Sequence, residues 1–237
     1  MSQNRNRGRI SICDDLSFAA SEAYKLLRTS LQYSFEGSHR CKVVGITSSV
    51  RNEGKSSLSI NLAYMLSKDK KKVLLLEGDM RLPTVAKRLG LQPNPGLSEY
   101  LTGLIRNDEG IQVSQKAPLL SVITSGVIPP NPSELLGSES MKRMLTALKE
   151  VFDYIIVDLP PVNIVSDPLV LANSLDGFVF VVRGDYSTRQ NVAEAMKKME
   201  IVNARVLGFV FNSGKPGTKY THDGQGYSPA ARKSNSQ

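Results

Sequence analysis

Residues 41–57, CKVVGITSSVRNEGKSS, decide the fold of this chain. The apolar run 41–47 predicts a buried strand, and residues from about 55 to 67 predict a helix. A loop that joins a strand to a helix in this way can turn its backbone N–H groups toward a phosphate. In that arrangement Lys55 would reach the terminal phosphates and the Ser56 hydroxyl would hold magnesium. The stretch therefore predicts a P-loop that binds ATP together with Mg²⁺.

The loop at 48–54 meets only the second half of the strict P-loop pattern, because Ser49 stands where the first glycine is expected. A Gly-Lys-Ser sequence also occurs by chance at the start of a helix. The strand before it and the helix after it favour the phosphate-binding interpretation. The residues expected to surround the nucleotide are Ser49, Asn52, Glu53, Gly54, Lys55, Ser56 and Ser57.

Acidic residues follow two further apolar strands. Glu77 and Asp79 come at the end of the strand expected at 72–77, and Asp158 ends the strand expected at 153–158. The carboxyl ends of parallel strands face the ligand crevice, so all three acids are expected beside the phosphates. Asp158 would serve magnesium, directly or through a neighbour, while Glu77 and Asp79 would hold magnesium or accept a proton. A strand-end turn is a reasonable alternative for one such acid, and a weaker one for three.

Helices and apolar strands alternate along the rest of the chain. Further strands are predicted at 119–124, 177–182 and 206–211, and helices at 17–36, 97–104, 138–151 and 188–202. Loop and helix signals mix over 78–97, a helix or a loop is expected up to 115, and 126–133 is a Pro-rich loop. Strands that are apolar almost throughout are buried on both faces, and their alternation with helices predicts a parallel sheet. The expected fold class is a doubly wound α/β P-loop NTPase, with a mostly parallel sheet flanked by helices.

The chain has 237 residues, of which 41% are hydrophobic, so it can bury the core of one domain. We expect a flexible basic arm at 1–16, a P-loop domain at 17–213 that begins with a helical arm, and a flexible C-terminal tail at 214–237. No apolar run approaches the roughly 20 residues of a membrane span, and no export signal is recognised. A cytoplasmic location is therefore expected, with Cys13 and Cys41 as reduced thiols.

The net charge of +8 has two interpretations. Solubility alone explains it, and attraction to an anionic surface is the functional alternative. No motif of interleaved basic and aromatic residues is found, so no specific nucleic acid partner is expected.

Five motifs, taken together and in their order, resemble one family. They are Glu22–Thr29, the P-loop at Thr47–Ser57, Leu74–Arg81 with Pro83, Pro129–Leu136, and Asp153–Pro161 with Asp167. Over about residues 17–213 the chain resembles the stand-alone cytoplasmic tyrosine kinases of bacteria, which are linked to capsule or exopolysaccharide synthesis. These kinases are similar to the P-loop ATPases that partition chromosomes and place division sites. The resemblance implies an ATP-dependent protein-tyrosine kinase that autophosphorylates and helps regulate polysaccharide synthesis and export.

The resemblance also implies roles for single residues. The catalytic group would be Lys55, Glu77, Asp79 and Arg81, with Ser56, Asp79 and Asp158 at magnesium and Asn212 reading adenine. Four positions depart from the family pattern, one of them Lys25, where Arg is usual. Glu77 stands where Asp is usual, which places its carboxylate one methylene further out. Arg51 and Asn52 replace a Pro-Gly pair, which would alter the loop.

Glu22, Lys25 and Arg28 are spaced three residues apart and share one broad face of a helix. A solvated face is the simpler interpretation, whereas the family uses this motif for contacts between subunits in a ring. The family phosphorylates a cluster of C-terminal tyrosines, and here the tail offers Tyr220 and Tyr227. These two are the expected phosphate acceptors.

The partners implied by the resemblance are a transmembrane modulator of the polysaccharide machinery, further copies of the chain, and a cognate tyrosine phosphatase. The chain would then be recruited peripherally to the cell membrane. Two other functions remain open at this stage. A partitioning ATPase usually has a signature lysine early in the P-loop, where this chain has Val50. A nucleotide-sensing assembly partner would bind ATP without kinase activity.

Overall fold

The computed structural model describes residues 13–35, 40–106 and 109–212. Its centre is a seven-stranded sheet in the order β3-β4-β2-β5-β1-β6-β7. The strands are β1 (Lys42–Ser48), β2 (Val73–Glu77), β3 (Ile111–Val113), β4 (Leu120–Ile123), β5 (Tyr154–Asp158), β6 (Gly177–Arg183) and β7 (Val206–Asn212). Every neighbouring pair is parallel except β3 with β4. The predicted fold class is confirmed.

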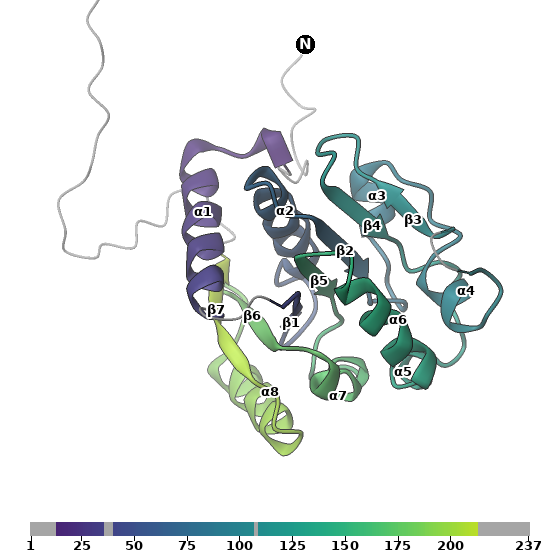
Figure 1. Cartoon of the computed structure of the whole chain (residues 1–237). Coiled ribbons are helices and arrows are strands. Elements are labelled where there is room, and N and C mark those ends of the chain that lie inside the picture. Colours follow the sequence, from purple (N-terminus) through teal and green to yellow (C-terminus); the bar gives the residue numbers. More distant parts are fainter. Residues whose placement is uncertain (1–12, 36–39, 107–108, 213–237) are drawn as a thin grey trace, which may run out of the picture.

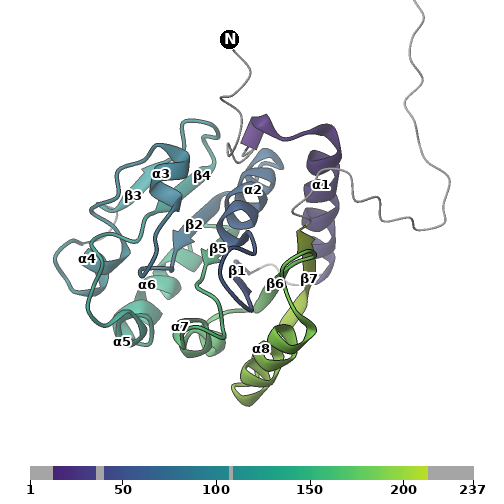
Figure 2. The same cartoon turned by 180° about the vertical axis from the view of Figure 1, so that it is seen from behind.

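Helices cover both faces of this sheet (Figures 1 and 2). They are α1 (Phe18–Tyr33), α2 (Lys55–Lys68), α3 (Val85–Leu89), α4 (Leu97–Leu101), α5 (Pro132–Leu136), α6 (Glu139–Lys149), α7 (Asp167–Val170) and α8 (Arg189–Ile201). Side chains alternate across β1, so Val44 packs with α1 and α2, whereas Val43 packs with α6 and α8. Both core layers therefore meet at β1, the strand that leads into the P-loop.

Side-chain N-caps begin three of the four longer helices in the described part of the chain, and α2 is the exception. Ser17, Ser138 and Thr188 cap α1, α6 and α8 through their side-chain oxygens. The residue before α2 is Gly54, in a left-handed conformation with φ of 99°, and it supplies no side-chain cap. The first N–H groups of α2 are thus left for a ligand at the end of β1.

The structure differs from the predicted elements in three places. Residues 111–113 form the antiparallel edge strand β3, where a helix or a loop was expected. The short helices α5 and α7 fall where no helix was predicted. Cys13 was expected in a flexible arm. It is instead buried at the start of a 3₁₀ helix, and its N–H donates to Asn61 Oδ1 on α2.

The expected tail at 214–237 and most of the arm at 1–16 lie outside the described residues, as do Tyr220 and Tyr227. Within the described ranges, no helix is both long enough and apolar enough to cross a membrane.

Candidate nucleotide-binding and catalytic site

A cleft of about 930 Å³ opens at the carboxyl ends of the central strands. The predicted site residues that line it are Asn52, Gly54, Lys55, Ser56, Ser57, Asp79, Arg81 and Asn212. The strand rule used in the sequence analysis thus brings the P-loop, the loop after β2 and the end of β7 to one place. Ser49, Glu53, Glu77 and Asp158 are not among the lining residues, and each is buried behind the cleft.

Ser49 and Glu53 shape the P-loop from its buried side. The Glu53 carboxylate accepts hydrogen bonds from Ser49 Oγ at 3.0 and 3.1 Å and from the Val50 N–H at 2.7 Å. It also accepts a bond from the hydroxyl of Ser187, in the loop after β6. These bonds hold the P-loop in its curved conformation. Glu53 therefore supports the loop from behind, and a direct contact with the nucleotide stays a prediction.

Lys55 brings a buried positive charge to the mouth of α2. Its side chain is only 8% exposed and lines the cleft. Burial raises the pKa of both Asp79 and Asp158, and the Lys55 charge partly offsets this rise. Together with the uncapped N–H groups of α2, this ammonium makes the floor of the cleft suitable for a polyphosphate.

Asp158 lies directly behind Ser56. Its carboxylate is 1% exposed and accepts hydrogen bonds from Ser59 Oγ at 3.0 Å and from the Ser56 hydroxyl. Burial raises the pKa of Asp158 to about 6, while the bond from Ser56 and the charge of Lys55 act in the opposite direction. A cation beside Ser56 would relieve the cost of this buried charge.

Oxygen donors in this arrangement suit Mg²⁺. The Ser56 hydroxyl, Asp79 and Asp158 provide one alcohol and two carboxylates, and Mg²⁺ in nucleotide sites is typically held by one or two carboxylates plus phosphate oxygens. No cluster of three or more His, Cys, Asp or Glu suited to a metal exists among the described residues. One alcohol and two carboxylates leave coordination positions of Mg²⁺ open, which phosphate oxygens and water can fill.

Asp79 is the acid that faces the cleft. Its Oδ1 accepts the Leu82 N–H at 3.1 Å, which leaves acceptor capacity on the carboxylate. Burial raises the pKa of Asp79, and the Leu82 hydrogen bond and the Lys55 charge counteract this rise. A carboxylate that faces the phosphate-binding floor with acceptor capacity left is placed to hold magnesium or to accept a proton.

Glu77 is placed differently from its expected catalytic role. The side chain is completely buried, and its Oε1 accepts the N–H groups of Thr84 at 2.5 Å and Val85 at 2.6 Å. Its Oε2 accepts the Ser125 N–H at 3.1 Å. Burial raises the pKa of Glu77 against the effect of these three bonds. The Glu77 carboxylate thus lies behind the cleft and accepts from the backbone of two loops, so it anchors those loops.

Arg81 joins the cleft to two short helices. Its Nε and Nη2 donate to the two oxygens of Asp167, at 2.9 and 3.0 Å, and Nη2 also donates to Ser133 Oγ at 3.2 Å. The Asp167 carboxylate is fully buried, whereas the Arg81 side chain is 39% exposed. The bonds to Asp167 raise the pKa of Arg81. Ser133 of the Pro129–Leu136 motif and Asp167 thus both hold the Arg81 guanidinium in place.

Several residues of the cleft were missed by the sequence analysis. Arg88 on α3 donates from Nη1 to Ser57 Oγ at 2.6 Å, and Arg183 donates from Nη1 to the Asn52 carbonyl at 3.1 Å. The Arg183 guanidinium also lies over the Tyr186 ring, 5.6 Å from its centroid. Arg183 is the last residue of β6, and the carboxyl ends of parallel strands face the ligand crevice, so its place in the cleft could have been predicted. The sequence holds no comparable signal for Arg88.

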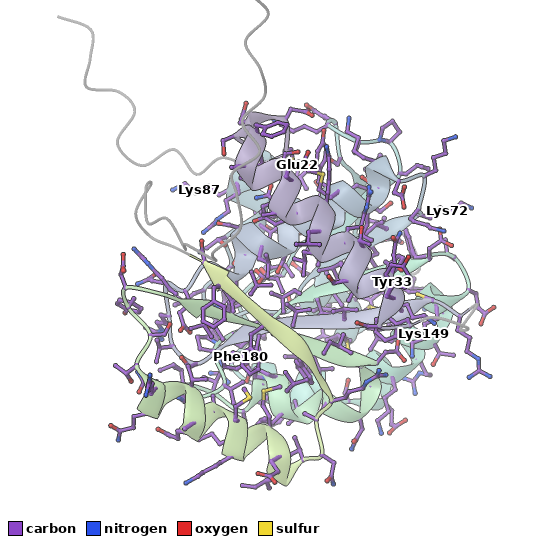
Figure 3. The ribbon with its side chains drawn as sticks, turned by 90° about the vertical axis from the view of Figure 1, so that its left-hand side faces the viewer. Glu22, Tyr33, Lys72, Lys87, Lys149 and Phe180 are labelled. Carbon is purple, nitrogen blue, oxygen red and sulfur yellow. The ribbon has the colours of Figure 1, made fainter. Side chains whose placement is uncertain are left out.

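The proposed subunit-contact motif on α1 separates into two parts. Glu22 and Lys25 form an exposed ion pair of 2.7 Å, and Figure 3 shows Glu22 on the outside of α1. Arg28 instead turns toward α2, where Nη1 is 3.5 Å from the Met65 carbonyl and 3.8 Å from Asp69 Oδ1. Arg28 is therefore partly engaged within the chain, and the exposed part of the motif is Glu22 with Lys25.

Comparison with known proteins identifies the family of this chain. A ParA family model, described as an NUBPL iron-transfer P-loop NTPase, matches residues 41–223. The tyrosine-protein kinase YwqD of Bacillus subtilis is 35% identical over 204 residues, which span 86% of this chain and 85% of YwqD. The septum site-determining protein MinD of Pyrococcus horikoshii, solved with Mg-ADP, has a TM-score of 0.61 at 19% identity over 72% of this chain and 70% of MinD, and it shares the fold.

The kinase domain of the Escherichia coli tyrosine kinase ETK is similar over nearly the whole chain. Its TM-score is 0.82 at 30% identity, and the match covers 95% of this chain and 89% of that domain. The resemblance inferred from the five motifs is confirmed by these matches. The chain belongs to the bacterial tyrosine-protein kinase family, built on a ParA-type P-loop NTPase domain.

Proposed function

We propose that this chain uses ATP and magnesium to phosphorylate tyrosine hydroxyls, with the cleft beside the P-loop as its active site. The observation that supports this proposal is the meeting of buried Lys55, the uncapped start of α2 and the partly free carboxylate of Asp79 in one cleft. The membership in a family of tyrosine-protein kinases supplies the acceptor, a tyrosine.

The reaction is an in-line transfer. The tyrosine oxygen attacks the γ-phosphorus of ATP, the bond from that phosphorus to the bridging oxygen breaks, and ADP leaves. Asp79 accepts the proton of the tyrosine hydroxyl, since it is the acid that lines the cleft. Lys55 and the first N–H groups of α2 bind the phosphate oxygens and stabilise their charge.

Magnesium, when bound with the nucleotide, would neutralise charge on the phosphate oxygens. Ser56 and Asp158 are the residues that would hold it while Asp79 accepts the proton; if Asp79 binds the metal instead, it cannot also serve as the base. We assign Asn212 to the adenine side of the site, because it lies at the end of β7 and its amide Nδ2 is fixed by the Glu53 carbonyl at 3.0 Å. Glu77 takes the role of loop anchor in this proposal.

The acceptors and partners follow from the family resemblance. We propose Tyr220 and Tyr227 as the first acceptors, on a neighbouring copy of the chain, with regulation of capsule or exopolysaccharide synthesis and export as the purpose. A transmembrane modulator would recruit the chain to the membrane, and a cognate tyrosine phosphatase would reverse the reaction. The exposed Glu22–Lys25 pair on α1 is available for contacts between copies, next to the exposed side chains of Phe18, Leu26 and Tyr33.

The test is phosphopeptide mass spectrometry of the purified chain after incubation with ATP and magnesium. Phosphate on Tyr220 or Tyr227 is expected, and Lys55→Met should abolish it because an apolar side chain of similar length cannot bind the phosphates. ATP hydrolysis without any phosphotyrosine, in the presence of added tyrosine peptide, would instead indicate a partitioning-type ATPase. Nucleotide binding with neither reaction would indicate an assembly partner.

A further inference from the structure

The contacts of Arg81 use only part of its guanidinium. Three of its five N–H groups are engaged, one on Nε and two on Nη2, by Asp167 and Ser133. Within the described residues no hydrogen bond involves Nη1. Because the guanidinium is planar, fixing the Nε and Nη2 edge also fixes the direction of Nη1.

The partners that fix this edge form a closed network. The Ser133 hydroxyl donates to Asp167 Oδ1, the same oxygen that accepts Arg81 Nη2. Asp167 is completely buried, so its carboxylate has little freedom to move and forms its only ion pair among the described residues with Arg81. The three residues come from the loop after β2, from α5 and from α7. Such an arrangement holds the guanidinium more rigidly than a single surface ion pair would.

Arg81 is a residue of the active-site cleft. Arg81 lines the cleft together with Lys55 and Asp79, and the Asp79 charge contributes to the raised pKa of Arg81. An N–H pair that has no partner among the described residues, held next to a phosphate-binding floor and the carboxylate of Asp79, is suited to an anion that appears during the reaction. A phosphoryl group is the anion that fits both neighbours.

We propose that Asp167 and Ser133 are positioning residues that lock Arg81 so that its Nη1 edge binds the phosphoryl group in transfer. This inference rests on the proposed function, because it assumes that the cleft performs phosphoryl transfer. The phosphoryl group can still belong to the nucleotide or already be attached to tyrosine. Arg81 touches it, whereas Asp167 and Ser133 act through Arg81.

The experiment compares Asp167→Asn, Ser133→Ala, Ser133→Thr and Arg81→Lys in the full chain. Asp167→Asn and Arg81→Lys should each lower kcat/KM for a tyrosine peptide by roughly 10- to 100-fold, since misplacement of a catalytic contact has effects of that size. The affinity for ADP should stay within about twofold of wild type, because ADP lacks the transferred group. The double variant Asp167→Asn/Arg81→Lys should have the same kcat/KM as Arg81→Lys alone, as expected for residues that act as one unit.

The Ser133 pair keeps the test valid if Asp167→Asn does not fold. Ser133→Ala retains the ion pair and should lower kcat/KM by about threefold, whereas Ser133→Thr, which keeps the hydroxyl, should restore it. The preference for a non-hydrolysable ATP analogue over ADP separates the two sources of phosphoryl group. If the variants lose this preference, Arg81 binds the γ-phosphate; if they keep it and bind a phosphotyrosine peptide less tightly, Arg81 binds the product.

The proposal is overturned if Asp167→Asn lowers ADP affinity as much as kcat/KM, or if its effect multiplies with that of Arg81→Lys. It is equally overturned if Ser133→Thr is as impaired as Ser133→Ala. A wild-type chain that transfers no phosphate to tyrosine refutes the proposed function separately. The affinities for the ATP analogue and for ADP can be compared without phosphate transfer, so this comparison still tests whether Asp167 and Ser133 position Arg81.

Discussion

The side-chain amide of Asn212 donates to the backbone carbonyl of Glu53, with 3.0 Å between Nδ2 and the oxygen. This bond joins the end of the last strand to the P-loop, which lies about 160 residues earlier in the chain. Gly54 comes next, and a Cβ built there would lie 2.1 Å from the same Asn212 nitrogen. A side chain at residue 54 would therefore push the Asn212 amide out of its bond to the P-loop.

Replacing Gly54 by alanine should weaken nucleotide binding by at least about tenfold and lower the unfolding temperature. The φ of 99° costs about 1–2 kcal/mol for an alanine, and the collision with Asn212 adds to it. Isothermal titration with ADP and thermal unfolding measure the two effects.

Gly90→Ala is the matched control, because Gly90 has a φ of 68° but no atom within 4 Å of its added Cβ. It should lose stability and keep nucleotide affinity. The double variant Gly54→Ala/Asn212→Ala removes the collision and should regain part of the lost stability. Unchanged ADP affinity in Gly54→Ala would show that the loop does not need this close approach.

Glu77 and Asp79 should give opposite results when neutralised. Glu77→Ala leaves three buried N–H groups without an acceptor, which is expected to cost about 3 kcal/mol or more of unfolding free energy. Asp79→Asn keeps the shape of a partly exposed side chain, so it should fold normally and lower kcat by about 100-fold or more. Urea unfolding and peptide phosphorylation assays measure the two quantities. A Glu77→Gln variant that unfolds like wild type but has lost kcat would return the base role to Glu77.

Asp158 should make the nucleotide-free protein less stable at neutral pH than at acidic pH. Its pKa is about 6 when folded against the usual 3.8, so the folded state binds this proton more tightly than the unfolded state does. Stability is then lost as the pH rises from about 4 to 6, by up to about 3 kcal/mol. Asp158→Asn should lose less stability than wild type in urea unfolding measured from pH 4 to 8, with a remaining loss from Glu77 and Asp79, whose pKa values burial also raises.

Asp185→Asn provides the control for this pH series, because Asp185 is exposed in the loop after β6. That variant should lose stability between pH 4 and 6 as wild type does. If Asp158→Asn loses as much as wild type over this range, the raised pKa of Asp158 is wrong.

The exposed pair on α1 offers a test of assembly that is separate from stability. Replacing Glu22 and Lys25 by alanine should change the unfolding free energy by less than about 0.5 kcal/mol, because their ion pair is solvent-exposed. If this face contacts other copies, the same variant should reduce the mass measured by light scattering. Alanine at Glu139 and Lys142, which form a pair of the same spacing and length on α6, is the control. Equal masses for wild type and both variants would remove α1 from the proposed contact.

The sequence predicted the parts of the fold that depend on local pattern. The apolar strands and the strand-end rule placed Lys55, Asp79 and Asp158 in one region, since each follows a strand with a clear periodicity. β3 could not be predicted, because three residues with a glutamine at their centre carry too little apolar pattern to be recognised as a strand. The helices α5 and α7 are similarly short, and each begins with or next to a proline.

The roles of individual acids depended on contacts that sequence distance hides. Glu77 differs from Asp79 because the backbone of Thr84, Val85 and Ser125 surrounds it, and nothing in the order of residues shows that. The link from Arg81 to Asp167 spans 86 positions and was visible only as two separate motifs. Long-range hydrogen bonding therefore separates the catalytic candidates from the supporting ones.

Transfer between two distinguishable copies of the chain tests the central claim most directly. The donor carries Tyr220→Phe and Tyr227→Phe with an intact cleft, and the acceptor carries Lys55→Met with both tyrosines. After incubation with ATP and magnesium, mass spectrometry should find phosphate on Tyr220 or Tyr227 of the acceptor only when the donor is present. The absence of phosphotyrosine from the acceptor and from an added tyrosine peptide, with a donor that binds ATP, would contradict the account.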